Sequence, residues 1–374
     1  MAFDVGSKLR PAETAILSAR IAELDFPAPP LVRARLLRLV ENGELGYPTW
    51  LGGGSPLREA FARRMEDRYR WTPNPSYVRE FTDVIQPIHA ILDLTTRPGE
   101  AVAMLTPSYP PFLASISEMR RQLVAIPMEG SQSWGFDIDR LARDVEQARC
   151  KILIMVNPHN PTGHSFSAVE LKSLAEVVIQ QDLLVISDEI YSDLVFPPRS
   201  HIPFASLDPE VAARTITLTS ASKAFKLAGL CCTVAHVGPP AVRAGLGRPP
   251  HLFGQVSVPG VAATLAAWGW SEPWLNGILR TLDGNRSLIA KALSDSGIGY
   301  LPPDAGFLAW LDCRALNLRT DPETFFRSRA RVRLSPGHHY GPGGRGFVRL
   351  SFGTSPEILR EICERMATAV RKRP

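Results

Sequence analysis

The chain has 374 residues, of which 45% are hydrophobic and 21% are charged, and its formal net charge is +5. This composition is typical of an ordinary soluble globular protein. The length exceeds what one hydrophobic core usually fills, so we expect two lobes.

The basic residues do not indicate a nucleic-acid-binding protein. They are scattered, apart from the alternating residues Arg327, Arg329, Arg331 and Arg333 and the tail Arg371–Arg373. No recognised nucleic-acid-binding motif accompanies them, so no nucleic-acid partner is expected. The period of two between the four arginines predicts one solvated face of a strand.

The five cysteines and the apolar segments bear on location. The cysteine count is odd and no spacing resembles a zinc site, which fits a reducing cytoplasm and predicts no bound metal. The N-terminus lacks an apolar signal core, and the best apolar run, Val256 to Trp270, is broken by Pro259 and two glycines. We therefore expect a soluble cytoplasmic protein that has no membrane partner.

The first elements of the chain are helices. After an irregular start, a helix is expected from Leu31 to Val40, and Gly52–Gly54 precedes a second one. Ser55 can cap that helix, and Pro56 fits its first turn. The glycine triplet is not a phosphate loop, because no Gly-Lys-Ser/Thr follows it.

A third helix is expected in the segment Phe81–Leu92, with Thr82 or Asp83 as its cap. The N-terminus of a helix offers free N–H groups and the positive end of the helix dipole, which suit a phosphate.

Short apolar strands then alternate with helical patterns such as Ser167–Gln181. The strands are Ala101–Leu105, Leu123–Pro127, Ile152–Val156, Leu183–Ser187 and Thr215–Leu218. This alternation predicts a mostly parallel sheet that is covered on both faces. Ligands of such sheets bind beyond the carboxyl ends of the strands. Tyr109, Asn160, Asp188 and Lys223 each lie at or just after such an end.

The last third of the chain changes pattern. It predicts one long helix, Glu272–Ser294, followed by the strands Gly306–Asp312 and Phe347–Phe352.

Lys223 follows a buried strand on a short turn, where desolvation and nearby cations lower the pKa of an amine and prepare it for imine chemistry. A lone lysine is usually a solvated surface residue. Here two further segments precede it, Asn157–Gly163 and Val185–Tyr191. Asn160 lies 28 positions before Asp188, which lies 35 positions before Lys223. Together these segments resemble the cofactor site of pyridoxal-phosphate (PLP) enzymes of the aspartate-aminotransferase fold.

The resemblance implies an α/β chain of PLP fold type I. Its large PLP-binding domain, with a mostly parallel seven-stranded sheet, would span residues 42–270. Residues 271–374 would form the interdomain helix and a small α+β domain, which the N-terminal segment 1–41 would join.

The resemblance also implies roles around the cofactor ring. Lys223 would be the Schiff-base lysine and would carry protons to and from the substrate. Asp188 would keep the pyridine nitrogen protonated, while Asn160 and Tyr191 would donate hydrogen bonds to the ring oxygen O3′. Tyr109 would stack on the ring.

At the phosphate, the resemblance implies the backbone N–H groups of Val84 and Ile85 and the hydroxyls of Ser220 and Ser222. Many aminotransferases add an arginine eight places after the lysine, where this chain has Cys231.

That replacement leaves phosphate charge unpaired. Lys226 would either supply a point-charge partner or point to solvent.

Two further residues carry over from the family. Arg349 would pair with the substrate α-carboxylate through a bidentate fork, with Asn160 beside it. Tyr47 would reach the cofactor phosphate of a neighbouring subunit, so we expect a homodimer with shared active sites that binds a small amino-acid substrate.

Several segments resemble the branch of cystathionine β-lyase-like C–S lyases. They are Ala22–Pro30, Gly43–Trp50, His159, His201–Phe204, Ser335–Gly341 and Arg345–Leu350. Three features depart from that branch: Tyr191 and Lys226 stand where it often has histidine and asparagine, and Gly54–Ala60 is more reminiscent of aminotransferases.

We therefore predict a PLP-dependent C–S β-lyase that cleaves a cysteine S-conjugate to thiol, pyruvate and ammonia. An aminotransferase is the alternative, as is a decarboxylation-linked deamination of an S-cysteine conjugate. A non-catalytic module on the same fold would need none of the expected site residues.

Overall fold

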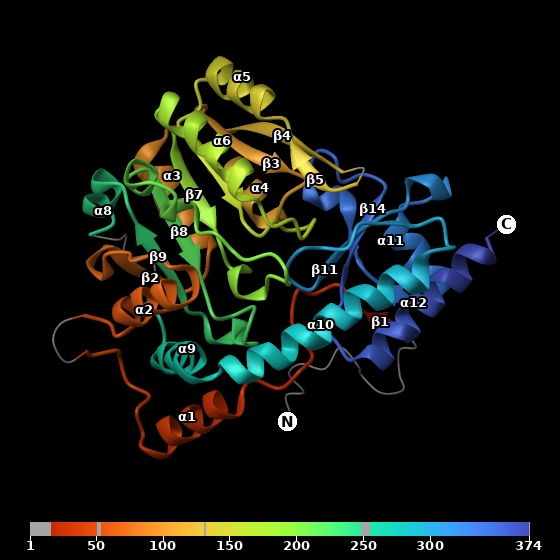
Figure 1. Cartoon of the computed structure of the whole chain (residues 1–374), viewed down its shortest axis with the longest axis horizontal. Helices are drawn as coiled ribbons and strands as arrows, with labels where there is room; N and C mark the ends of the chain where they lie inside the picture. The colour runs from red at the N-terminus through yellow and green to blue at the C-terminus, as the bar shows by residue number, and fades with distance from the viewer. Residues whose placement is uncertain (1–15, 51–53, 131, 248–254, 374) are drawn as a thin grey trace.

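The computed structural model describes residues 16–50, 54–130, 132–247 and 255–373 (Figure 1). Its main feature is an eight-stranded sheet with the strand order β2-β9-β8-β7-β6-β3-β4-β5. The strands are β2 (Val78–Phe81), β3 (Ala101–Thr106), β4 (Gln122–Gly130), β5 (Trp134–Phe136), β6 (Ile152–Val156), β7 (Leu184–Asp188), β8 (Thr215–Thr219) and β9 (Thr233–Val237). β4, β3, β6, β7 and β8 run parallel, while β2, β9 and β5 pair antiparallel. The mostly parallel α/β sheet predicted from the sequence is confirmed, and the three-residue β5 is a strand more than the seven expected.

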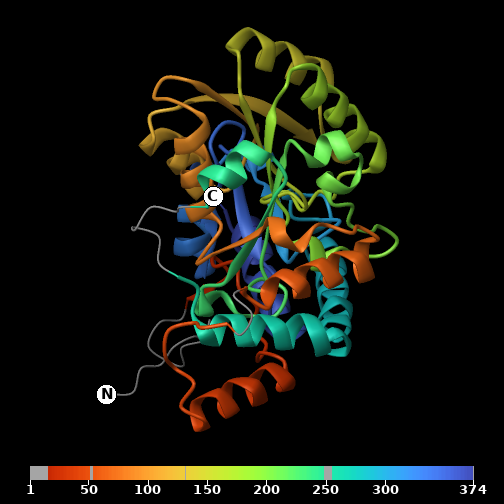
Figure 2. The same ribbon diagram turned by 90° about the vertical axis from the view of Figure 1, so that its left-hand side faces the viewer.

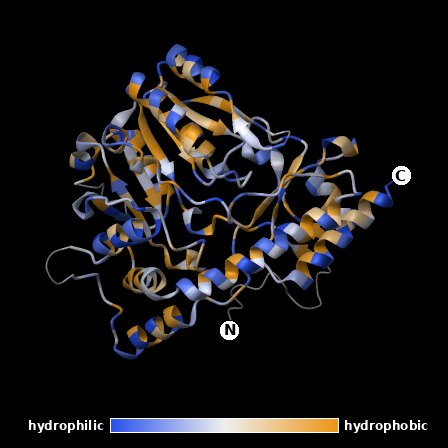
Figure 3. Cartoon of the chain, in the orientation of Figure 1, coloured by the Kyte–Doolittle hydropathy of each residue, from blue (hydrophilic) through white to orange (hydrophobic). Residues whose placement is uncertain are grey.

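Helices cover both faces of this sheet because its central strands are apolar on both sides. In β3, Val102 and Met104 pack into the core under α3 (Ile85–Thr95) and α4 (Pro110–Glu118). Ala103 and Leu105 face the opposite way, into a second core under α5 (Ile138–Ala148), α6 (Ala168–Gln180) and α7 (Pro209–Ala212). The hydropathy colouring shows the strands of this sheet as a largely hydrophobic layer (Figure 3).

A smaller antiparallel sheet contains β10 (Gly299–Tyr300), β11 (Leu308–Asp312), β14 (Phe347–Ser351) and β13 (Ser335–Pro336), in that order. β1 (Leu17–Ser18) pairs with β12 (Val332–Arg333), which places the N-terminal segment against this unit. The helix α10 (Glu272–Leu293) packs along α12 (Pro356–Arg371) beside it (Figure 1). The three-part division at residues 41 and 270 stays a prediction.

Of the remaining helices, the short α11 (Pro322–Phe325) packs beside β13 and β14, and the others lie at the opposite end of the molecule (Figure 1). α1 (Pro30–Glu41) packs against α9 (Val258–Trp270), and α2 (Leu57–Tyr69) packs on the other side of α9 (Figure 2). A short helix, α8 (Pro240–Gly245), follows β9. Ser55 accepts a hydrogen bond from the N–H of Leu57, as expected for the cap of α2. Gly52 and Gly53 of the glycine triplet lie outside the described residues.

One sequence interpretation is wrong. The alternating arginines do not line one strand, because Arg327 and Arg329 lie in a π-helical turn, Phe326–Ala330. Phe326 and Ala330 are buried four residues apart, which is a helical spacing, and only Arg333 belongs to a strand. The third predicted helix also begins late: Phe81 ends β2, and α3 starts at Ile85.

No helix in the described ranges is long and apolar enough to cross a membrane. Within the same ranges, no group of three or more His, Cys, Asp or Glu side chains could hold a metal ion.

The strand β9, which lies between β2 and β8, carries a buried histidine, His236. Its ring lies among Phe61, Trp71 and Tyr77, with ring centroids 5.1–6.0 Å away, and neither ring nitrogen has a hydrogen-bond partner within the described chain. Burial, with a smaller contribution from Arg243, lowers the pKa of His236 to about 4.

We predict that this histidine makes stability depend on pH. His236 is protonated below about pH 6.5 in the unfolded chain but only below about pH 4 in the folded chain. The free energy of unfolding therefore falls as the pH drops through this window. The loss attributable to His236 is up to about 3 kcal/mol. Chemical unfolding of the apo-protein at pH 7 and pH 4 should show a smaller difference for His236→Phe than for the unchanged protein. An equal pH difference in both proteins would contradict the assignment.

Candidate active site

The candidate site is a cavity of about 290 Å³ at the carboxyl ends of the parallel strands. It brings together most of the residues that the sequence predicted. Those that line it are Val84, Ile85, Tyr109, Asn160, Asp188, Tyr191, Ser220, Ser222 and Lys223. They come from the ends of adjacent strands or from the turns that follow, as expected for a doubly covered parallel sheet.

Lys223 lies on the turn after β8, and its Nζ donates a hydrogen bond to the carbonyl of Ala22 at 3.1 Å. Burial lowers the pKa of its amine, and Arg349 lowers it further, while Asp188 and Glu23 oppose these effects. A lowered pKa raises the fraction of neutral amine, which is the form that attacks a carbonyl carbon.

Asp188 is the last residue of β7 and is buried. Burial raises the pKa of its carboxyl group to about 7; the N–H of Ile190, which donates to Oδ1 at 3.2 Å, and the Lys223 ammonium only partly offset that rise. The carboxylate is therefore under-compensated, and a cation beside it would lower its free energy.

Arg349 lies on β14 and contacts the site through Asn160, although it is not among the residues that line the cavity. Its Nη1 donates to Asn160 Oδ1 at 3.2 Å, and its Nη2 donates to the carbonyl of Arg20 at 3.0 Å. Nη2 also lies 3.4 Å from the hydroxyl oxygen of Ser335, and the guanidinium lies 5.2 Å from the ring centre of Tyr340. Its Nε is buried and has no hydrogen-bond partner in the part of the chain that the structure describes. A guanidinium held in this way can receive a carboxylate.

Two tyrosines flank the cavity. Tyr109 is the residue before α4, and Tyr191 follows β7. Burial raises the pKa of both phenols. The hydroxyl of Tyr191 is buried without a hydrogen-bond partner among the described residues, so it retains a donor for a bound group.

The expected phosphate end is already hydrogen-bonded within the chain. Asp83 Oδ1 accepts from the N–H groups of Ile85 at 2.7 Å and Gln86 at 2.9 Å, which makes Asp83 the cap of α3. Ser220 Oγ donates to the carbonyl of Cys232 at 2.6 Å and accepts from the N–H of Ser222 at 3.1 Å. A phosphate bound through Ile85 would therefore displace the Asp83 carboxylate.

Two predicted phosphate ligands lie outside this cavity. Lys226 is half-buried with a left-handed φ of 58°, and it does not line the cavity. Tyr47 is 91% exposed, so it does not serve the cavity of its own chain. The Lys226 contact and the cross-subunit role of Tyr47 stay predictions.

Sequence reasoning missed the contribution of the N-terminal segment. The carbonyls of Arg20 and Ala22 accept hydrogen bonds from Arg349 and Lys223 respectively. Backbone groups carry no residue-type signal, and this segment is brought to the site by the pairing of β1 with β12 and by hydrogen bonds of Ala19 and Arg20 to Ser351 and Ser335. Asp83 was identified as a helix cap, but its place in the cavity was not foreseen.

Comparison with known proteins decides the family. The family model described as aminotransferase class I and II matches residues 23–366. The chain belongs to the class I and II aminotransferase family.

Within this aminotransferase family, three similarities extend over nearly the whole chain. Cystathionine beta-lyase PatB of Bacillus subtilis is 30% identical over 357 residues, which cover 94% of this chain and 91% of PatB. The solved structure of OvoB has a TM-score of 0.91 and 32% identity, and each chain is covered completely. The PLP-bound C–S lyase from Staphylococcus hominis has a TM-score of 0.89 and 27% identity over 95% of this chain and 93% of that one.

The residues of this aminotransferase-family site fit PLP. Asp188 is a desolvated carboxylate that needs a cation, as a protonated pyridine nitrogen provides. The unpartnered Tyr191 hydroxyl offers a donor to a ring oxygen, and Lys223 offers a buried amine with a lowered pKa.

We predict that Asp188→Asn weakens cofactor binding without lowering the stability of the apo-protein. Asparagine can still accept the hydrogen bond from the N–H of Ile190, and it removes a charge that burial disfavours, so the melting temperature of the apo-protein should not fall. The PLP dissociation constant should rise about tenfold or more, since a charged hydrogen bond contributes roughly 1.5–3 kcal/mol. Titration of the apo-protein with PLP, followed by absorbance, measures this. An unchanged dissociation constant would exclude Asp188 as the pyridine partner.

Proposed function

We propose that this chain is a PLP-dependent C–S β-lyase that cleaves an S-substituted cysteine, with water, to a thiol, pyruvate and ammonia. Its cofactor is pyridoxal 5′-phosphate, and its chemical class is that of the carbon–sulfur lyases. The observation that carries the proposal is one cavity lined by Lys223 and Asp188, with Arg349 hydrogen-bonded to Asn160 in its lining. The near full-length similarity to PatB and to a PLP-bound C–S lyase supports a lyase reaction.

Bound PLP supplies an electron sink for the carbanion that forms at the substrate Cα. The protein residues hold the parts in place. Arg349 clamps the substrate carboxylate, and Asn160, hydrogen-bonded to it, sets the orientation of that clamp. Asp188 keeps the ring nitrogen protonated, and Tyr191 donates to the ring oxygen.

Lys223 moves the proton. Once its amine is free it takes the proton from Cα, and elimination then breaks the Cβ–S bond so that the sulfur leaves as a thiolate. Since burial and the Arg349 charge lower the pKa of the lysine, more of it is in the neutral form needed for this step than for a solvated lysine. Arg349 therefore both binds the carboxylate and tunes the base.

We predict that Lys223→Ala loses the visible absorbance of the covalently held cofactor and nearly all turnover. The assay incubates the holoenzyme with cystathionine and other cysteine S-conjugates and measures thiol, pyruvate, ammonia and keto acid together. Stoichiometric thiol and pyruvate without an added keto acid acceptor indicate a lyase. A retained absorption spectrum in Lys223→Ala would overturn the cofactor assignment, and turnover that requires a keto acid acceptor would indicate an aminotransferase.

We also propose a homodimer with shared sites. Tyr47 is 91% exposed, and the nearby apolar side chains Leu31, Leu37, Val40 and Leu45 are 51–63% exposed on and after α1. Exposed apolar side chains grouped in this way favour burial against another surface. A second copy would place its Tyr47 beside this chain's cofactor phosphate.

This arrangement predicts complementation between two impaired variants. A mixture of Tyr47→Phe and Lys223→Ala chains forms hybrid dimers in which one of the two sites has both residues intact. At equal amounts and free exchange, activity should recover to about a quarter of that of the unchanged enzyme. Mass spectrometry of the mixture verifies subunit exchange. Demonstrated exchange with no recovered activity would exclude the shared site.

A further inference from the structure

Asp193 is a buried carboxylate two residues beyond Tyr191, on the 3₁₀ turn Ser192–Leu194. Three side chains of α2 surround its Oδ1: Arg64 Nη2 at 2.8 Å, Arg68 Nε at 3.2 Å and the Tyr69 hydroxyl, which donates at 2.9 Å. The side chains of Arg64 and Asp193 are only 4% and 7% exposed. A charge buried to this extent persists only when it is paired, so the three contacts fix where Asp193 lies.

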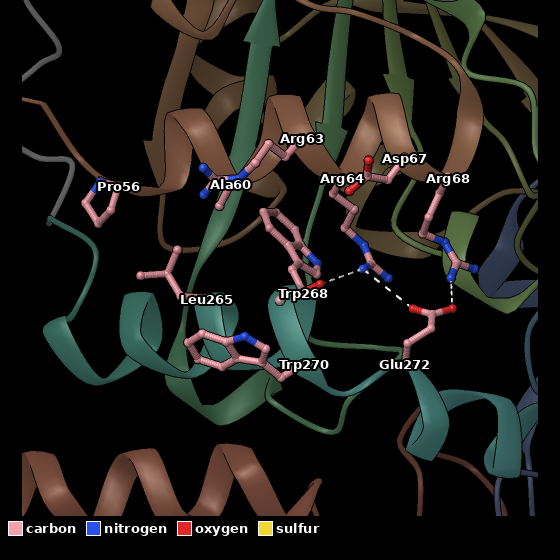
Figure 4. A pocket seen from close by; sticks show the side chains of 11 residues that line it. Pro56, Ala60, Arg63, Arg64, Asp67, Arg68, Leu265, Trp268, Trp270 and Glu272 are labelled. Carbon is pink, nitrogen blue, oxygen red and sulfur yellow. Dashed lines mark hydrogen bonds and ion pairs between the residues drawn. The ribbon is translucent and has the colours of Figure 1, made fainter.

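The same arginines extend to the surface (Figure 4). Arg68 Nη1 donates to Glu272 at the start of α10, and Arg64 Nη1 lies 3.9 Å from the other oxygen of Glu272. Arg64 Nη1 also donates to the carbonyl of Trp268 at 3.3 Å. A cavity of about 940 Å³ lies beside these contacts, between α2 and the junction of α9 and α10. Asp193 therefore forms the inner end of a network whose outer end, Glu272, is partly exposed.

The backbone transmits the position of Asp193 to Tyr191. The N–H of Leu194 donates to the carbonyl of Tyr191 at 2.9 Å, and the N–H of Gly306 donates to the carbonyl of Leu194 at 2.9 Å. The Tyr191 ring packs against Gly306, so closely that a Cβ added to this glycine would lie 3.3 Å from the ring. The ring also packs edge-to-face against Phe307. The ring is thus held between the Gly306–Phe307 backbone and a turn that Asp193 ties to α2.

We propose that Asp193 is a positioning residue for the reaction: held by Arg64, Arg68 and Tyr69, it sets the place of the Tyr191 hydroxyl relative to the cofactor's ring oxygen. It touches neither cofactor nor substrate. The role rests on the proposed function, specifically on Tyr191 as the donor to that oxygen.

The visible absorption band of the bound cofactor reports the Tyr191 hydrogen bond. A hydrogen bond donated to an anionic oxygen favours the deprotonated form and lowers the pH midpoint of the band. Loss of one charged hydrogen bond, as in Tyr191→Phe, should raise the midpoint by roughly one to two pH units. Asp193→Asn should raise it by about half of that change or more, and should lower kcat with little change in KM because Arg349 is untouched.

Other charged and titratable groups face Tyr191 and remain in every variant. They are Arg349, Tyr109, Asp188 and Tyr340. The matched control is Glu272→Gln, which removes the outer carboxylate of the same network and leaves all three contacts of Asp193 in place. Its midpoint should stay at that of the unchanged holoenzyme.

The experiment titrates the four holoenzymes spectrophotometrically and records their melting temperatures. A midpoint raised in Asp193→Asn but not in Glu272→Gln supports the proposal. A lower melting temperature with an unmoved midpoint in Asp193→Asn, or an equal shift in Glu272→Gln, overturns it. Should Asp193→Asn not fold, Tyr69→Phe removes one hydrogen bond to the same oxygen and is judged by the same criterion, with a smaller rise expected.

Tyr191→Phe separates this inference from the function on which it rests. If its midpoint moves and that of Asp193→Asn does not, only the positioning role fails. If its midpoint does not move, the assignment of Tyr191 in the proposed function fails and the positioning role fails with it.

Discussion

The site depends on buried charges that the protein does not fully compensate by itself. Asp188 is buried and Lys223 is half-buried at the ends of adjacent strands, and desolvation raises the pKa of the carboxyl group and lowers that of the amine. Arg349 adds a positive charge from the other sheet, which lowers the pKa of the lysine further. Because burial lowers the local dielectric constant, each charge is sensitive to the next one placed beside it. The two sheets therefore meet beside a buried carboxylate, Asp188, that a bound cation would stabilise.

Three carboxylates within six residues show how partners decide the role of a buried acid. Glu189, next to Asp188, accepts from Ser187 Oγ at 2.9 Å, from the N–H of Phe204 at 3.0 Å and lies 2.8 Å from His201 Nε2. Asp193 forms ion pairs with two arginines and accepts a hydrogen bond from a tyrosine hydroxyl. These two acids face cations or hydrogen-bond donors and anchor the loop on either side of Tyr191, whereas Asp188 accepts one long backbone hydrogen bond and lines the cavity. A satisfied buried network rigidifies its surroundings, which is what an under-compensated neighbour requires in order to stay in place.

Short-range patterns in the sequence predicted the sheet and the strand-end residues of the cavity, and the family resemblance supplied its other predicted residues. Apolar runs such as Ile152–Val156 identify buried strands, and residues just after neighbouring strand ends meet by geometry, which places Asn160, Asp188 and Lys223 together. What the sequence could not predict depends on distant pairing: the carbonyls of Arg20 and Ala22, and the contact of Asp193 with α2, about 125 positions away. From the sequence alone, an aspartate in a turn is expected to be solvated, and only the folded structure shows that Asp193 is buried. The prediction of a strand in the arginine-rich segment was wrong because it followed the period of two in the charges. The two buried residues, Phe326 and Ala330, have a helical spacing.

The N-terminus of α3 adds a constraint on how any anion enters the site. Asp83 already occupies the first N–H groups of the helix, so a phosphate arriving there replaces one negative charge with another rather than filling an open donor set. The binding free energy gained at this end is the difference between binding a phosphate and binding the Asp83 carboxylate. It is therefore smaller than the gain at a helix terminus whose N–H groups are free. At the other end of the cavity the situation is the reverse, because the Asp188 carboxylate lacks sufficient positive charge beside it. We therefore expect cofactor affinity to depend more on the pyridine end and the lysine than on this helix terminus, where a bound phosphate would displace the Asp83 carboxylate.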